Sequence, residues 1–325
     1  MFQYESVVGK TLKNNSMITR GRLPELPYQE WTKTRLTLHL ILQIIGKTRL
    51  KLTRRKNHWW YITIYVTSRG FGTHSIPLED GLNSFEIEFD VRKRAVVLYK
   101  CSGKEIEISL QSNPTIAAFY NQFMEAMEQW GCKPDFVPKP FDIGIEKRFD
   151  EITEYHHYDW EYIERFALAM RWNKDVFQEF SGRFYGKTCP VHIYWHHLDL
   201  TVTRFSGKKL PPMDKSARVL EKDSYSHEQI SFGFWAGDDN MPEPMYYAYT
   251  FPSPDGLDKE TIQPDQAKWV DSNGSPMALL SYNVVIHSEN PREEVLKFLE
   301  STYQAGASKA GWDIGEFSVS PLNEL

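Results

Sequence analysis

One order of elements occurs twice along the chain, and this limits the possible folds more than any other feature. In each half, a helical stretch is followed by short runs of alternating or β-branched residues and then by a helix that opens with Asn-Pro. Consecutive strands without intervening helices usually pair antiparallel, so this order predicts the α+β class. We expect two tandem helix–antiparallel sheet–helix units related by a pseudo-two-fold internal repeat.

The first unit is expected at residues 23–132. The apolar residues of 31–45 are too numerous for one stripe, which predicts a largely buried helix that ends at Gly46. The closing helix is expected to start with Asn-Pro at 113–114, with Asn as its N-cap, and to end at Gly131. Strands are expected between the two helices at 49–52, 59–67, 85–89, 95–99 and 106–110.

The second unit is expected at residues 158–325, with a first helix that starts at Asp159. A Pro-rich linker at 133–157 would separate the units, and residues 1–22 would form an extension outside them. The second unit also carries a Pro/Gly-rich insertion at 235–256. Matched segments recur in the same order in both halves, which argues for a duplication rather than chance. They are Gly-Lys-Thr at 46–48 and 186–188, two segments that begin with His and end with Val-Thr at 58–67 and 192–203, and Asn-Pro at 113–114 and 290–291.

Composition narrows the class of protein. The chain has 10 Trp, 17 Tyr and 19 Phe while 25% of its residues are charged, which excludes a disordered or collagen-like protein. No signal-peptide pattern is visible, and no stretch approaches the ~20 apolar residues that span a bilayer. We therefore expect a soluble, cytoplasmic protein with no membrane partner. Its 3 cysteines form no CxxC pair, which predicts free thiols.

Histidines are the candidate catalytic residues. His39 shares one face of the first predicted helix with Gln43, so this polar face either lines a cleft or is exposed to solvent. His227 and Glu228 are adjacent on a predicted strand and point to opposite faces, which argues against a direct dyad. The candidate acid/base residues are His39, His58, His192, His227 and Glu228.

Aromatic and charged side chains near these histidines are the candidate ligand-binding residues. Arg69 and Arg204 both follow a Val-Thr pair, and each could offer forked donors to a carboxylate or phosphate or pair with an acid of the chain. The aromatic residues either pack in the core or form a binding platform. The candidate ligand-binding residues are Gln43, Trp59, Trp60, Arg69, Trp195, Asp199, Arg204 and Tyr225.

A metal ion and a nucleic acid are less favoured partners. His192, His196 and His197 could ligate a metal, but no HExxH or paired-acid spacing accompanies them, so we assign no metal; the sequence leaves the cofactor unknown. The basic run at 47–56 precedes an aromatic segment, which is compatible with a nucleic-acid track. Because the net charge of the chain is −5, we favour the interpretation that this basic run is a solvent-exposed edge and not a nucleic-acid site.

Several long runs of the sequence carry a family resemblance. They lie at 37–50, 57–71, 85–90, 186–207, 225–237 and 301–313. These runs resemble a bacterial family of uncharacterised proteins, domain of unknown function 5996, and the similarity extends over nearly the whole chain from about Leu23. The resemblance implies a bacterial, cytosolic, single-chain protein and supplies no activity.

Two functions from different classes fit these patterns. The first is a small-molecule-binding protein or enzyme with an aromatic-lined polar cleft between the two repeat units. The alternative is a non-catalytic adaptor that uses an exposed aromatic or basic surface for a protein or nucleic-acid partner. The sequence decides neither whether the protein is an enzyme nor its oligomeric state.

Overall fold

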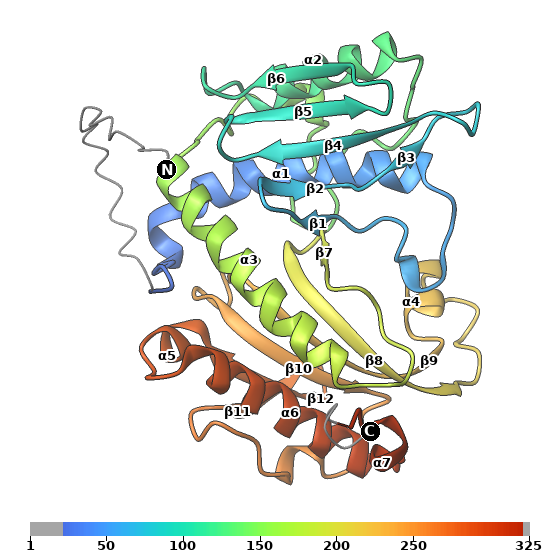
Figure 1. Ribbon diagram of the computed structural model, residues 1–325, viewed down its shortest axis with the longest axis vertical. Helices are drawn as coiled ribbons and strands as arrows, with labels where there is room; N and C mark the ends of the chain where they lie inside the picture. The colour runs from blue at the N-terminus through green and yellow to red at the C-terminus, as the bar shows by residue number, and fades with distance from the viewer. Residues whose placement is uncertain (1–21, 321–325) are drawn as a thin grey trace, which may run out of the picture.

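The computed structural model describes residues 22–320 and contains two antiparallel sheets (Figure 1). The first sheet has the order β1 (Tyr65–Val66), β2 (Gly70–Gly72), β4 (Ser84–Asp90), β5 (Ala95–Lys100) and β6 (Glu105–Ser109), with β3 (Ile76–Pro77) paired to β4. The second has the order β11 (Lys268–Ser272), β12 (Ser275–Ser281), β10 (Met245–Phe251), β9 (His227–Trp235), β8 (Asp199–Lys209) and β7 (His192–Tyr194). This architecture confirms the α+β class.

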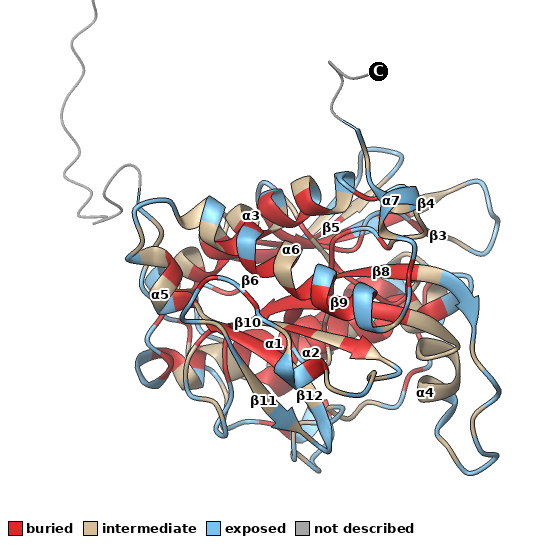
Figure 2. Cartoon of the chain, turned by 90° about the horizontal axis from the view of Figure 1, so that it is seen from below, coloured by how far each residue is buried: buried red, intermediate tan, exposed pale blue. Residues whose placement is uncertain are grey.

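Long helices pack on each sheet. In the first half, α1 (Tyr28–Leu52) contacts β3 and α2 (Ile116–Gln129) contacts β6. In the second half, α3 (Trp160–Gly182) and α6 (Pro291–Lys309) lie on the sheet of β8, β9 and β10, where buried residues gather (Figure 2). The helix α3 begins beside α1 and crosses from one sheet to the other (Figure 1).

Short elements complete the fold. They are the helices α4 (Val219–Ser224), α5 (Tyr282–Ile286) and α7 (Ile314–Phe317) and the 3₁₀ turns η1 (Asn57–Trp59), η2 (Phe149–Glu151) and η3 (Leu257–Lys259). No helix within residues 22–320 is long and apolar enough to cross a membrane. The residues 1–21 of the expected N-terminal extension lie outside the described residues.

Helix α1 is buried on nearly all sides, as its apolar sequence predicts. It runs on to Leu52, so the predictions of an end at Gly46 and of a strand at 49–52 were wrong. A Cβ at Gly46 would lie 2.1 Å from Cδ1 of Trp195. Because Gly46 has no side chain, the Trp195 indole can pack directly against the backbone of α1. Gly46 therefore serves a close contact rather than a helix end.

The strand expected at 59–67 is also wrong over most of its length. Only Tyr65–Val66 is a strand, and the preceding residues form η1 and turns. His58 and Trp59 have φ angles of 55° and 60°, which no strand contains. The His58 ring lies 4.7 Å from the ring of Phe205 on the second sheet, so packing between distant segments overrides the β-propensity of this run.

The N-cap of α2 differs from the predicted one. The hydroxyl of Thr115 accepts a hydrogen bond from the Ala118 amide at 3.1 Å, whereas Asn113 has a φ of 52° and lies outside the helix. In the second half, the predicted start of the first helix at Asp159 is confirmed. The Asp159 side chain accepts hydrogen bonds from the amides of Glu161 and Tyr162 and so caps α3.

The two sheets meet at their edges through one pair of residues. Ile64 and Ile193 exchange backbone hydrogen bonds of 3.1 and 2.8 Å, which joins the segment before β1 to β7. Both halves have the order helix, sheet, helix, but the two Gly-Lys-Thr segments matched in the sequence do not occupy equivalent elements. Residues 46–48 lie inside α1, whereas 186–188 lie between α3 and β7. The structure therefore leaves the pseudo-two-fold repeat unconfirmed.

Replacing Gly46 by alanine is expected to lower the free energy of unfolding by about 2 kcal/mol or more, because the new methyl group would overlap the Trp195 ring. Gly182→Ala is the matched control. Gly182 is also a helical residue, the last of α3, but has open space around it, so this change should be neutral or stabilise by up to ~1 kcal/mol. Urea denaturation of both variants measures the difference, and equal effects would contradict the packing argument.

Candidate functional site

One face of the second sheet is covered by α3 and α6, and the other face forms the floor of a cleft of about 900 Å³. Side chains along β8 point alternately to the face covered by the helices and to the face that lines the cleft. Arg204 points to the helices and donates to the carbonyl of Phe180 at 2.5 Å, whereas Thr201 and Thr203 line the cleft. The walls come from α1, η1, α4 and residues 141–143. The cleft therefore lies between the second sheet, α4 and segments from the first 143 residues of the chain.

The floor of the cleft is polar although it is buried. Thr201 donates to the carbonyl of Phe232 at 2.9 Å, and the hydroxyls of Thr203 and Ser231 are 3.1 Å apart. Sheet faces that pack against another layer are normally apolar, so a face with buried hydroxyl groups is the informative exception. These hydroxyl groups make the floor suitable for hydrogen bonds to a ligand.

Asp199 is the acidic group of this floor. The Tyr247 hydroxyl donates to its Oδ2 at 2.5 Å, while Oδ1 has no hydrogen-bond partner among the described residues. Burial raises the pKa of Asp199, because a carboxylate removed from water is less stable in its charged form.

A glycine gives Tyr247 access to Asp199. Gly233 on β9 lies between Thr201 and Tyr247 in the strand register, and a Cβ there would be 2.2 Å from Cζ of Tyr247. Because Gly233 has no side chain, the Tyr247 ring can cross β9 and reach the carboxylate on β8.

His39 enters the cleft from α1 and is held in one tautomer. Its Nε2 lies 2.9 Å from the carbonyl oxygen of Trp195, so Nε2 carries the proton that is donated to this carbonyl. Burial lowers the pKa of His39 to about 3, which keeps the ring neutral at pH 7. Gln43, one turn further along α1, pairs with both the amide and the carbonyl of Phe141 at 2.7 and 3.0 Å.

His58 also lines the cleft and accepts a hydrogen bond from a lysine. Its Nε2 is 2.6 Å from Nζ of Lys187, and its Nδ1 is 3.4 Å from the carbonyl oxygen of Ser224. An ammonium group can only donate, so Nε2 accepts and Nδ1 carries the proton. Burial and, second, the Lys187 charge lower the pKa of His58. The Trp59 indole donates to the carbonyl of Leu220 at 3.2 Å and so attaches α4 to this side.

The structure brings part of the predicted site together. The predicted residues that line the cleft are His39, His58, Trp59, Trp60, Asp199 and Tyr225. Three more stand behind them: Gln43 holds residue 141, the carbonyl of Trp195 orients His39, and the His227 ring is 5.5 Å from that of His58.

Four predicted residues lie elsewhere. Arg69 pairs with Glu88 on the first sheet at 3.3 Å, and Glu228 pairs with Lys208 at 2.7 Å. His192 is buried, neither of its ring nitrogens has a hydrogen-bond partner within residues 22–320, and burial lowers its pKa to about 3.

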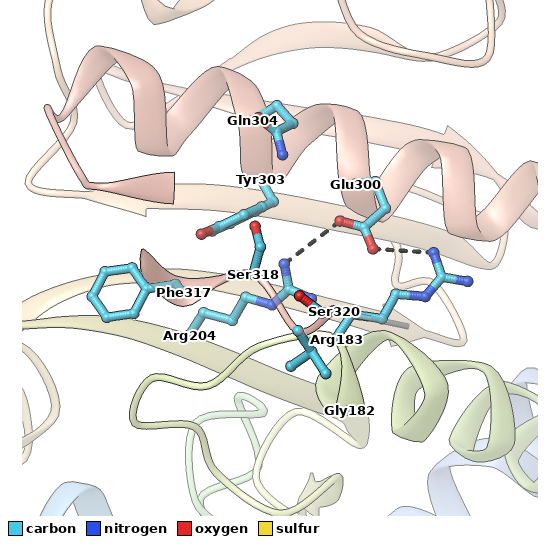
Figure 3. Close-up of a pocket in the computed structure, with 10 residues that line it drawn as sticks. Gly182, Arg183, Arg204, Glu300, Tyr303, Gln304, Phe317, Ser318 and Ser320 are labelled. Carbon is cyan, nitrogen blue, oxygen red and sulfur yellow. Dashed lines mark hydrogen bonds and ion pairs between the residues drawn. The ribbon is translucent and has the colours of Figure 1, made fainter. Parts of the chain in front are cut away.

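Arg204, the fourth, lines a separate cavity of about 550 Å³ beside α6 (Figure 3). Its side chain is 1% exposed, and the guanidinium lies 3.5 Å from the ring centre of Phe180 and 4.4 Å from that of Tyr303. Glu300 lies between Arg204 and Arg183, at 3.6 and 3.2 Å. A carboxylate of the chain thus already occupies the position that an anionic ligand would take.

Several residues of the cleft escaped the sequence analysis. They are Tyr194, Thr201, Thr203, Ser231, Trp235 and Tyr247. The available signal was the alternation in residues 199–203, where polar residues flank Leu200 and Val202 and indicate a strand with one polar face. Tyr247 reaches the cleft through the pairing of its strand with β9, and a local sequence pattern does not indicate which strands pair.

The alternative partners find less support. Within residues 22–320, no three His, Cys, Asp or Glu side chains gather closely enough to hold a metal ion. In the basic run at 47–56, Lys47 and Arg49 are buried in α1 and Arg55 pairs with Asp223 at 3.1 Å. Trp59 is only half-buried and stacks on Tyr61 with ring centres 5.7 Å apart.

The fold and the cleft define a two-sheet α+β protein with a polar, aromatic-lined cavity on one sheet. The chain belongs to a family of unknown function, DUF5996, whose model matches residues 23–319. No curated protein and no solved structure matches the chain. The family membership agrees with the resemblance found in the sequence and assigns no activity.

His192→Phe is expected to leave the free energy of unfolding at pH 7 unchanged or higher, because it removes a buried imidazole for which the described residues provide no hydrogen-bond partner. The unfolded chain binds a proton at this residue near pH 6.5 and the folded chain only near pH 3, so wild-type stability falls as the pH decreases through this range. The variant should lose less stability there, by up to about 1.4 kcal/mol per pH unit. Urea denaturation at pH 7 and pH 5 tests this, and a large loss at pH 7 would contradict it.

Proposed function

We propose that the protein binds a small organic molecule in the cleft between α1, α4 and the second sheet. The observation that carries this proposal is the buried polar face of the sheet under a space of about 900 Å³. A volume of this size with apolar walls and a few fixed polar groups is typical of ligand sites. Aromatic rings from η1, from Tyr225 directly after α4 and from the strands provide part of the walls.

We infer that His39 and Asp199 are the acid/base candidates of this site. A neutral imidazole of fixed tautomer and a carboxyl group of raised pKa are the kinds of group that transfer protons in enzymes. Their position in one cleft supports a catalytic use of the bound molecule.

We further propose that the cleft lies between two copies of one unit, at 23–132 and 158–325, joined by the linker at 133–157. The common order of helix, sheet and helix supports this, as does the edge contact of Ile64 and Ile193. Residues 141–143 of the linker form part of the cleft wall. A bacterial, cytoplasmic setting is a proposal that rests on the resemblance in the sequence.

Narrowing the cleft should abolish ligand binding without unfolding the protein. Met277 lines the cleft from β12, so Met277→Trp is expected to reduce the affinity for fragments that occupy it by about tenfold or more. The experiment is a screen of soluble aromatic and aliphatic fragments by thermal shift and ligand-observed NMR on the wild-type protein and the variant.

Met124→Trp is the matched control. Met124 is also half-buried but lies on α2, far from the cleft lining, so fragment binding should stay unchanged. Fragments that bind all three proteins equally, or a wild-type protein that binds none, would refute the proposed function.

A further inference from the structure

We infer that the ligand of the cleft carries a cationic group, of the amidinium or aralkylammonium class, which Asp199 binds. The inference rests on the proposed function, since it concerns the same cleft. Three observations support it: an oxygen of Asp199 has no hydrogen-bond donor among the described residues, the other charged groups of the cleft are mostly acidic, and aromatic rings lie beside the carboxylate.

Asp199 is 8% exposed and receives one hydrogen bond from a side chain, from Tyr247. A carboxylate has about four acceptor positions, and leaving an oxygen unpaired in a buried place costs roughly 1–3 kcal/mol. Its Oδ1 has no partner within residues 22–320, although the residue lines an open cleft. The missing group is a donor, and a charged donor gives the strongest bond to a carboxylate.

Within residues 22–320, no lysine or arginine pairs with Asp199, and the His197 imidazole, which acts on its carboxyl group through space, pairs with Asp142 at 3.4 Å. The arginines of the lining are Arg35 and Arg218, and both have other partners. Arg218 pairs with Glu221 at 2.8 Å, and Arg35 donates to the Tyr28 hydroxyl at 3.1 Å. No salt bridge to Asp199 occurs in the described part of the chain.

The remaining charges make the cleft acidic. Its carboxyl-bearing residues are Asp142, Asp199, Glu221, Asp238 and Asp239, against two arginines. Burial lowers the pKa of His39 and of His196 to about 3, so neither ring adds positive charge at neutral pH. An anionic ligand would meet repulsion here, whereas a cation would be attracted into the cleft.

Aromatic rings surround the carboxylate in the sheet. Tyr194 on β7 and Trp235 on β9 are both directly opposite Asp199 in the strand register, which places them on the same face. The Tyr247 ring is 5.7 Å from that of Trp235. Ring faces attract cations when water is excluded, so the rings and Asp199 favour the same kind of ligand.

Three planar probes of nearly the same shape separate the possibilities: benzamidinium, benzamide and benzoate. Their affinities for the full chain at neutral pH are measured by titration calorimetry. Benzamidinium is expected to bind about tenfold or more tightly than benzamide, and benzoate more weakly than either. Asp199→Asn should weaken benzamidinium binding by about tenfold and leave benzamide binding within about twofold.

Asp265→Asn is the control, because this aspartate is exposed and lies outside the cleft lining. It should change neither affinity. The Asp199→Asn protein should melt no lower than the wild type, because a neutral amide is easier to bury than an unpaired carboxylate. A lower melting temperature together with lost binding of all probes would overturn the inference, since Asp199 would then be structural.

Other results would also overturn it. Equal affinities of benzamidinium and benzamide, with no effect of Asp199→Asn, would mean that the cleft binds neutral molecules. Tighter binding of benzoate would mean that it selects anions. Both results leave the proposed function intact if Met277→Trp abolishes the binding. Absence of benzamidinium binding at millimolar concentration refutes the cationic class, and the fragment screen then decides separately whether the cleft binds any ligand.

Discussion

The contact of Trp195 with Gly46 fixes the relation between the two halves of the chain. The indole ring lies against the backbone of α1, and its Nε1 donates to the carbonyl of Ile62 at 3.0 Å. The carbonyl of the same residue accepts from His39. One residue of the second half thus contacts the buried helix, the turn after it and the histidine of the cleft. Because interiors are close-packed, this single ring restricts all three positions together.

The two faces of the second sheet differ, because one packs in the core and the other lines the cleft that we propose as the ligand site. The face towards α3 and α6 carries residues such as Val202 and Phe232, which are completely buried and belong to the core. The opposite face carries hydroxyl groups, a carboxylate and rings around an open space. Since alternate residues of a strand point to opposite faces, the same strands serve both purposes without conflict.

Much of the fold was predictable, because it follows from local patterns. The starts of α3 and α6 at Asp159 and Asn290 were visible as helix caps, and the strands of the first sheet from Ser84 onward lie close to where alternation indicated. The predictions for 46–64 were wrong because contacts with Trp195 and Phe205, far along the chain, decide that conformation.

The site was predictable to a smaller extent for the same reason. His39 and His58 stand out as polar residues in apolar or aromatic runs, so composition alone marks them. Tyr247 gains its position through the pairing of β10 with β9 and through the space above Gly233.

The edge contact of Ile64 and Ile193 has one more consequence. Unpaired strand edges are templates for aggregation, and here each half of the chain shields an edge of the other. The junction of the sheets therefore leaves fewer unpaired backbone groups at these two edges.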